Sequence, residues 1–90
     1  MPGLSVAVVT PEREVFSGQA DMVVAHGVDG DVGILPHHAP MLIQLGEAPV
    51  RILEAQREVS IRVAGGFLHV SPGEDVTRVD VLAERADTVE

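Results

Sequence analysis

Four histidines are the side chains of this sequence best suited to holding a metal ion: His26, His37, His38 and His69. A zinc site needs three or four His, Cys or carboxylate ligands that converge on one point. His37 and His38 are adjacent, so on a strand they would point to opposite faces. Prolines on both sides place them in a loop instead. The spacing therefore predicts loop and surface histidines that bind no metal.

Two glycine-containing segments look briefly like ligand loops. Asp29-Gly30-Asp31 could open a calcium loop, but the EF-hand pattern needs a Glu eleven residues after Asp29, and Pro40 stands there. A hairpin turn built on Asp-Gly fits better. Gly27, Gly30 and Gly33 lack the spacing of a dinucleotide-binding loop. Neither segment predicts a cofactor.

Nucleophilic catalysis has little to draw on. The chain has no Cys and no Lys, and its serines lack the Gly-x-Ser-x-Gly pattern of a nucleophile elbow. No active site is visible, and a binding or structural role is favoured over an enzyme. Two alternatives stay open. One is a stand-alone β-sandwich module that binds a metal or small ligand through His37, His38 and His69, and the other is a small cupin-like enzyme.

The net charge of the chain limits the classes of partner that it can bind. Six basic residues, all Arg, stand against fourteen acids, for a net charge of −8. Such a chain repels a phosphate backbone, and it has only two aromatic side chains on which bases could stack. Nucleic acid is therefore excluded as a partner. Neither a long apolar run nor a signal peptide is evident, which predicts a cytoplasmic protein without direct membrane insertion.

The elements that position these residues are predicted to be short strands. Turn signals recur about every 6–12 residues, as in an all-β sandwich or barrel. Residues 58–64 and 77–81 alternate apolar and polar side chains, so each has one buried face. Residues 4–9 are apolar on both faces, and we expect the face with Ala7 and Val9 to be covered by a partner. Gly65-Gly66 predicts a bulge or sharp bend. Residues 52–58 could form a helical turn, and residues 82–90 could start a helix.

Three blocks, which span nearly the whole chain in order, resemble the epsilon subunit of F-type ATP synthase. The most specific is the string Gly33-Ile34-Leu35-Pro36 with His38-Ala39-Pro40 after one intervening residue. It lies within the second of the blocks, which are Val8–Asp21, Asp29–Leu42 and Val63–Val70 with its continuation through Ala83.

The resemblance implies a fold and a function. The fold would be all-β, a two-sheet sandwich of about ten short strands, over residues 1–84. Residues 85–90 would be a tail where the family's C-terminal helical hairpin begins; we expect a naturally short form without hairpin, ATP site or cofactor. The function would be that of a non-catalytic rotor subunit of the central stalk, at the cytoplasmic face of a bacterial cell membrane. It would link the gamma subunit to the c-ring and couple proton or sodium flow to ATP synthesis.

The resemblance also assigns contact residues. Thr10, His38 and Ile43 match positions on the gamma side. Asp29, Gly30 and Asp31 match the segment that faces the polar loops of the c-ring.

One departure from the family pattern bears on the loop before Pro40. His37 stands where the family usually has Gly. If that Gly serves a positive φ, then His37 must adopt the same conformation.

Overall fold

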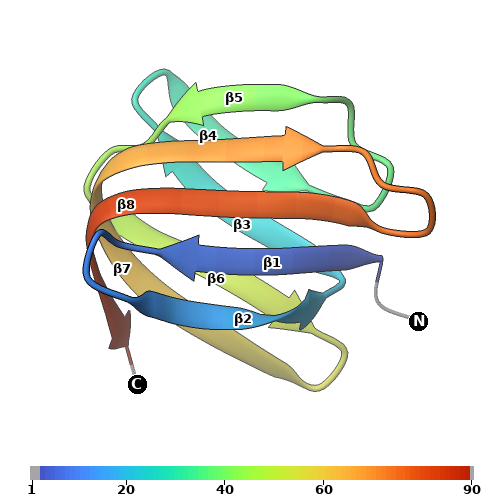
Figure 1. The fold of residues 1–90 in the computed structure, drawn as a ribbon, viewed down its shortest axis with the longest axis horizontal. Coiled ribbons are helices and arrows are strands. Elements are labelled where there is room, and N and C mark those ends of the chain that lie inside the picture. The colour runs from blue at the N-terminus through green and yellow to red at the C-terminus, as the bar shows by residue number, and fades with distance from the viewer. Residues whose placement is uncertain (1–2, 90) are drawn as a thin grey trace.

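The computed structural model describes residues 3–89, and every regular element in that range is a strand. Figure 1 shows the eight strands arranged in two layers. Their bounds are β1 Leu4–Val9, β2 Glu14–Ala20, β3 Met22–Gly27, β4 Gly30–Ile34, β5 Met41–Gln44, β6 Ala48–Glu54, β7 Arg57–Ser71 and β8 Thr77–Val89. The structure over residues 3–89 contains no helix long and apolar enough to cross a membrane.

Two long strands, β7 and β8, belong to both layers. The hydrogen-bonded order is β2-β1-β8-β7-β6-β3-β4, and β5 pairs with the second half of β7. The first layer holds β2, β1, β5, the start of β8 and the end of β7. The second holds β4, β3, β6, the start of β7 and the end of β8. The predicted two-sheet sandwich is confirmed, and the shared strands explain why eight strands serve where about ten were expected.

The passage from one layer to the other occurs at Gly65-Gly66, as the glycine pair predicted. Both residues have positive φ, 72° and 117°, which side chains with a Cβ rarely adopt. A Cβ on Gly66 would also lie 2.1 Å from the carbonyl oxygen of Leu82 on β8. Glycine therefore lets β7 bend while it remains paired with β8.

The core between the layers is aliphatic. Leu, Val, Ile and Ala supply all the fully buried apolar side chains, and Phe16 only packs against their edge. Alternation of side chains places them there: Leu4, Val6 and Val8 point inward from β1. With two Phe and no Trp or Tyr in the chain, β-branched side chains fill the space instead.

The two suggested helical segments are strands and turns instead. Residues 52–58 form the end of β6, a tight turn at Ala55-Gln56 and the start of β7, because Ile52 is needed in the core opposite Val59. Residues 82–89 belong to β8. The segment set apart as a tail, through residue 89, pairs with β7, where Ala86 is buried opposite Val63; residue 90 lies outside the described range.

Candidate functional site

The outer face of the first layer carries an apolar stripe made of Val9, Leu42, Phe67 and Leu82. Strand register brings three of them into one row, since Phe67 lies opposite Leu82 and Leu82 lies opposite Val9. Leu42, Phe67 and Leu82 are exposed by 64%, 47% and 55%. Apolar side chains gathered on one exposed face mark a contact surface. We call this set the apolar stripe; it includes the Val9 face that the sequence predicted to be covered.

A shallow depression of about 500 Å³ deepens one end of the apolar stripe. Val9, Phe67 and Leu82 are its large apolar lining residues, and the bend at Gly65-Gly66 also lines it. Thr10 and Glu84 contribute polar groups to the lining. The depression is open to solvent and large enough to receive one or two apolar side chains of another chain.

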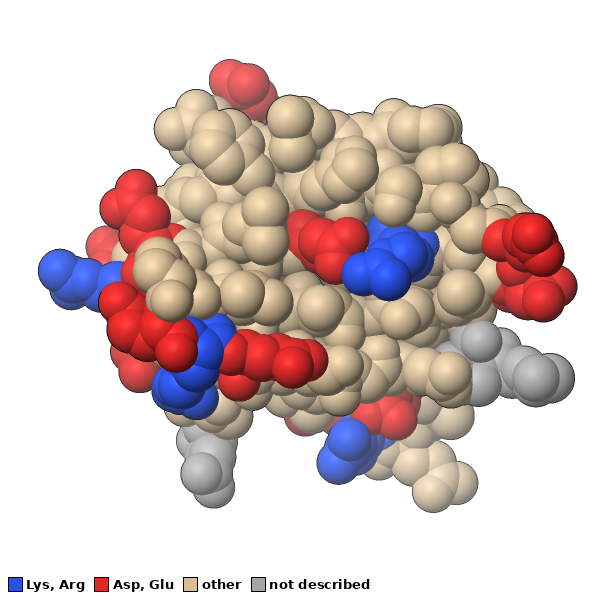
Figure 2. All heavy atoms as spheres, viewed as in Figure 1, with Lys and Arg blue, Asp and Glu red and all other residues tan. Residues whose placement is uncertain are grey.

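Charge is distributed unevenly around this face. Figure 2 shows it as largely uncharged, interrupted over β8 by one acidic and one basic side chain side by side, with most of the remaining charge at its ends. Arg78 and Asp80 form an ion pair on β8, with 3.1 Å between Nη2 and Oδ1. The low charge density over the stripe suits burial against a partner, since unpaired charges are costly to desolvate.

The tip of the β3–β4 hairpin forms a second candidate surface. Gly27 pairs with Gly30, which has a φ of 138°, across a two-residue turn made of Val28 and Asp29. The hairpin predicted at Asp29-Gly30 is thus present, but its turn lies one residue earlier in the chain. Asp29, Gly30 and Asp31 are all exposed there. His26 on β3 lies opposite Asp31 on β4, and its Nδ1 is 2.6 Å from Asp31 Oδ1. The tip is anchored to β5 through the amide of Val28, which donates to the carbonyl of Gln44.

The loop between β4 and β5 lies at the opposite end of the sandwich. His37 has a φ of 69°, so it adopts the conformation that Gly would serve at this position. Its amide donates to Thr77 Oγ1 at 2.8 Å, which ties the loop to the start of β8. The ring of Pro36 packs so closely on Gly3 that a Cβ there would overlap it. His38 is half-buried, and its Nδ1–H donates to the carbonyl of Ala39 at 2.7 Å.

The three residues expected on the gamma side lie far apart. Thr10 is buried, and its hydroxyl and amide both donate to the carbonyl of Arg13 in the β1–β2 turn. His38 is at the other end, beyond the length of the six-residue β1, about 20 Å away. Ile43 is partly buried against the core. Its strand, β5, runs between these two ends and places Leu42 on the apolar stripe.

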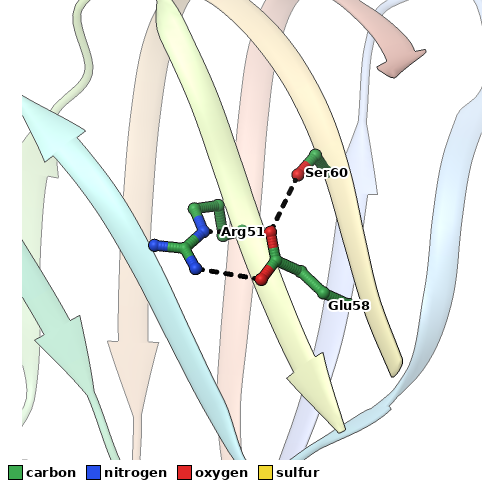
Figure 3. A network of polar contacts seen from close by, with 3 residues as sticks. All are labelled: Arg51, Glu58 and Ser60. Carbon is green, nitrogen blue, oxygen red and sulfur yellow. Dashed lines mark hydrogen bonds and ion pairs between the residues drawn. The ribbon is translucent and has the colours of Figure 1, made fainter. Parts of the chain in front are cut away.

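The outer face of the second layer is polar. Arg51 on β6 donates through Nε and Nη2 to both carboxylate oxygens of Glu58 on β7, at 3.0 and 2.9 Å, and Ser60 Oγ adds a third contact at 3.3 Å (Figure 3). The guanidinium of Arg51 lowers the pKa of Glu58 from its ordinary value, chiefly through the hydrogen bonds. All three side chains are at least partly exposed, so this network suits a solvated face rather than a chemical site.

The histidines of the metal-binding alternative are not gathered together. His69 is on the outer face of β7, opposite Leu42 and Asp80, whereas His37 and His38 lie in the β4–β5 loop. Between residues 3 and 89, no three His, Cys, Asp or Glu side chains are arranged to hold a metal ion. The structure thus offers no support for that alternative.

Two features escaped the sequence reading. The stripe residues Leu42, Phe67 and Leu82 come from three strands, and their distances along the chain give no hint of contact. The His26–Asp31 pair is the second: a two-residue turn at Asp29-Gly30 would place Val28 opposite Asp31, and only the observed turn at Val28-Asp29 brings His26 opposite Asp31.

Comparisons with known proteins agree on one family. Residues 3–89 match the family described as the ATP synthase Delta/Epsilon chain, beta-sandwich domain. The chain is 50% identical over 88 residues to the ATP synthase epsilon chain of Brevibacillus brevis, covering 97% of this chain and 64% of that protein. It is 46% identical over 92 residues to the epsilon chain of Dehalococcoides mccartyi, covering 100% of this chain and 61% of that one. The chain thus spans just under two thirds of the length of these relatives.

The epsilon chain of Frankia casuarinae is 48% identical over 84 residues, which cover 92% of this chain and 94% of that one. Among solved structures, a chain of the Euglena gracilis mitochondrial ATP synthase superposes with a TM-score of 0.84 at 17% identity, covering 98% of this chain and 54% of that chain. A chain from the central stalk and c-ring of the Tetrahymena thermophila enzyme gives 0.68 at 16% identity, with 89% and 63% covered. These two likenesses concern the fold.

Proposed function

The chain belongs to the delta/epsilon chain family of ATP synthase, and from this premise we propose that it is a non-catalytic rotor subunit of the central stalk of an F-type ATP synthase. It links the gamma subunit to the c-ring and helps couple proton or sodium flow to ATP synthesis. The observation that carries this proposal is the match of residues 3–89 to the family, with 50% identity to one epsilon chain.

The gamma subunit binds the outer face of the first layer. The apolar stripe supplies the buried centre that a stable protein interface needs, and Phe67 is its aromatic anchor. The three residues expected on the gamma side all belong to segments that border this face. Thr10 borders the depression, β5 carries Ile43 past the stripe, and His38 lies just before β5 at the far end. One elongated contact along β5 has Thr10 and His38 near its two ends, while Ile43, whose side chain packs against the core, supports β5 from beneath.

The c-ring binds the tip of the β3–β4 hairpin. Asp29, Gly30 and Asp31 are exposed there, and the two carboxylates suit Arg or Lys side chains on polar loops. The tip adjoins the apolar stripe at Gln44, because Gln44 accepts from Val28 and lies opposite Phe67. A subunit with one partner on its face and another at its tip links the two, as a rotor component must. Through the c-ring it sits peripherally at the cytoplasmic face of the membrane.

The test is co-elution of the chain with its cognate gamma subunit on a sizing column. Leu82→Ser places a hydroxyl in the apolar stripe and should weaken co-elution, while Val28→Ser is the matched control. Both side chains are about equally exposed, at 55% and 56%, but Val28 lies in the hairpin turn and is not one of the stripe residues. Co-elution lost with Leu82→Ser and kept with Val28→Ser supports the proposed surface. Failure of the unaltered chain to co-elute at micromolar concentration refutes the gamma linkage.

A further inference from the structure

The hairpin tip contains an exposed histidine–carboxylate pair. His26 and Asp31 are directly opposed on β3 and β4, and their side chains meet on the outer face with 2.6 Å between Nδ1 and Oδ1. The Asp31 side chain is 69% exposed and that of His26 is 37% exposed. A carboxylate oxygen can only accept when ionised, so Nδ1 carries the hydrogen and donates it. The pair therefore holds one carboxylate oxygen of Asp31 and leaves the other available to a partner.

Within residues 3–89, His26 is the ionisable side chain that pairs with Asp31. The other charged groups on neighbouring segments are Asp29 in the turn and Glu47 after Gly46, whose amide donates to the His26 carbonyl. On β6, Arg51 lies opposite Val24, but it is held by Glu58. Among residues 3–89, no Arg side chain forms an ion pair with Asp31, so the charge of His26 decides the charge that the pair presents.

We propose that His26 is a positioning residue that orients Asp31 for a cationic partner loop and makes that contact stronger at higher pH. Imidazole changes its charge between about pH 5 and 8. Protonated His26 cancels the charge of Asp31, so a cationic loop meets a neutral pair. Neutral His26 still donates from Nδ1, so the carboxylate keeps its orientation and its full negative charge. The proposal rests on the proposed function, in which the partner loop belongs to the c-ring.

The expected effect is modest. An exposed ion pair changes affinity by about two- to fivefold, because solvent and salt screen the charges. The affinity for the c-ring should therefore rise by about that factor between pH 6 and pH 8. His26→Gln replaces the imidazole with an amide that donates a hydrogen bond but never ionises. That variant should bind at both pH values as tightly as the unaltered chain binds at the higher one.

Two measurements test the proposal on the full chain. The first is the ¹⁵N spectrum of the His26 ring at high pH, where the hydrogen should reside on Nδ1 and should lose that preference in Asp31→Asn. The second is binding to a purified, detergent-solubilised c-ring at about pH 6 and pH 8. His69→Gln is the control, since it removes an exposed histidine on the other layer.

The outcomes separate the two proposals. A pH-dependent affinity that is flat in His26→Gln and retained in His69→Gln supports the role of His26. Binding whose pH dependence survives in His26→Gln overturns that role and leaves the c-ring linkage standing. A ring hydrogen on Nε2 in the unaltered chain also overturns it. No binding at either pH overturns both the c-ring linkage and the role of His26.

Discussion

Replacing His37 with glycine should stabilise the protein. His37 has a φ of 69°, the one positive φ at a non-glycine residue in the described part of the chain. Its ring is exposed, and its one hydrogen bond in the structure, to Thr77 Oγ1, uses the main-chain amide, which glycine also has. The substitution thus removes a strained backbone conformation and very little contact.

The size of the effect follows from two opposing terms. A non-glycine residue in the left-handed region costs roughly 1–2 kcal/mol. Glycine itself lowers the free energy of unfolding by about 0.5–1 kcal/mol, because it is more flexible in the unfolded chain. The free energy of unfolding should therefore rise by about 0.5–1 kcal/mol, which corresponds to a Tm increase of about 2–8 °C for a domain of this size.

The neighbouring histidine provides the matched control. His38 does not have a positive φ, and its ring Nδ1–H donates to the carbonyl of Ala39. His38→Gly should therefore lower the free energy of unfolding by about 1 kcal/mol. Urea unfolding and thermal melts of both variants measure the difference. If His37→Gly is destabilising by as much as His38→Gly, the positive φ of His37 is unstrained and the reasoning fails.

Three further predictions concern the bend, the core and the polar face. Gly66→Ala should lower the free energy of unfolding by more than about 3 kcal/mol, because the added Cβ would overlap the main chain of β8. Gly30→Ala should lower it by only about 1–2 kcal/mol, because no atom lies within 4 Å of the added Cβ and only the φ is unfavourable. Equal urea midpoints for the two variants would contradict this. Leu68→Ala should lower the free energy of unfolding by about 2–5 kcal/mol, since the side chain is fully buried, and a loss under 1 kcal/mol in urea melts would mean that the core refills the space. Arg51→Gln should remove a contribution to stability that is present above the ordinary Glu58 pKa of 4.5 and is lost as pH falls through the lower folded-state pKa. The two proteins should therefore converge in stability under acid, and a constant difference from acid to neutral pH would argue against it.

Local patterns in the sequence predicted most of the fold. Alternation over residues 58–64 and 77–81 identified buried strand faces, and Asp-Gly identified the hairpin, although its turn is Val28-Asp29. The helical turn suggested at residues 52–58 and the helix suggested from residue 82 were wrong, because even good helix formers such as Ala and Glu gain less than about 1 kcal/mol per residue from helix propensity. Pairing with β7 outweighs that preference. The sequence also did not predict the length of β7 and β8, since Gly65-Gly66 indicates a strand end when the partner strand is unknown.

The contacts within the candidate surfaces were predicted less well than the strands. The contact between His26 and Asp31 required the structure, because it depends on a turn at Val28-Asp29 instead of the predicted Asp29-Gly30. Thr10 matched a family position, but its hydroxyl is used within its own turn. The separation of Thr10 from His38 along β1 required the structure.

The sequence by itself determined the strand periodicity and the presence of the hairpin, because each depends on residues close together in the chain. It also determined the family, through three blocks of residues, and that resemblance led to the expected positive φ at His37. The tertiary structure decided which exposed side chains form one surface. Phe67 lies opposite Leu82, and Leu42 shares their exposed face, only through the register of β5, β7 and β8. That register is set by which faces of the strands the core buries, and a shift of one residue would turn the stripe inward.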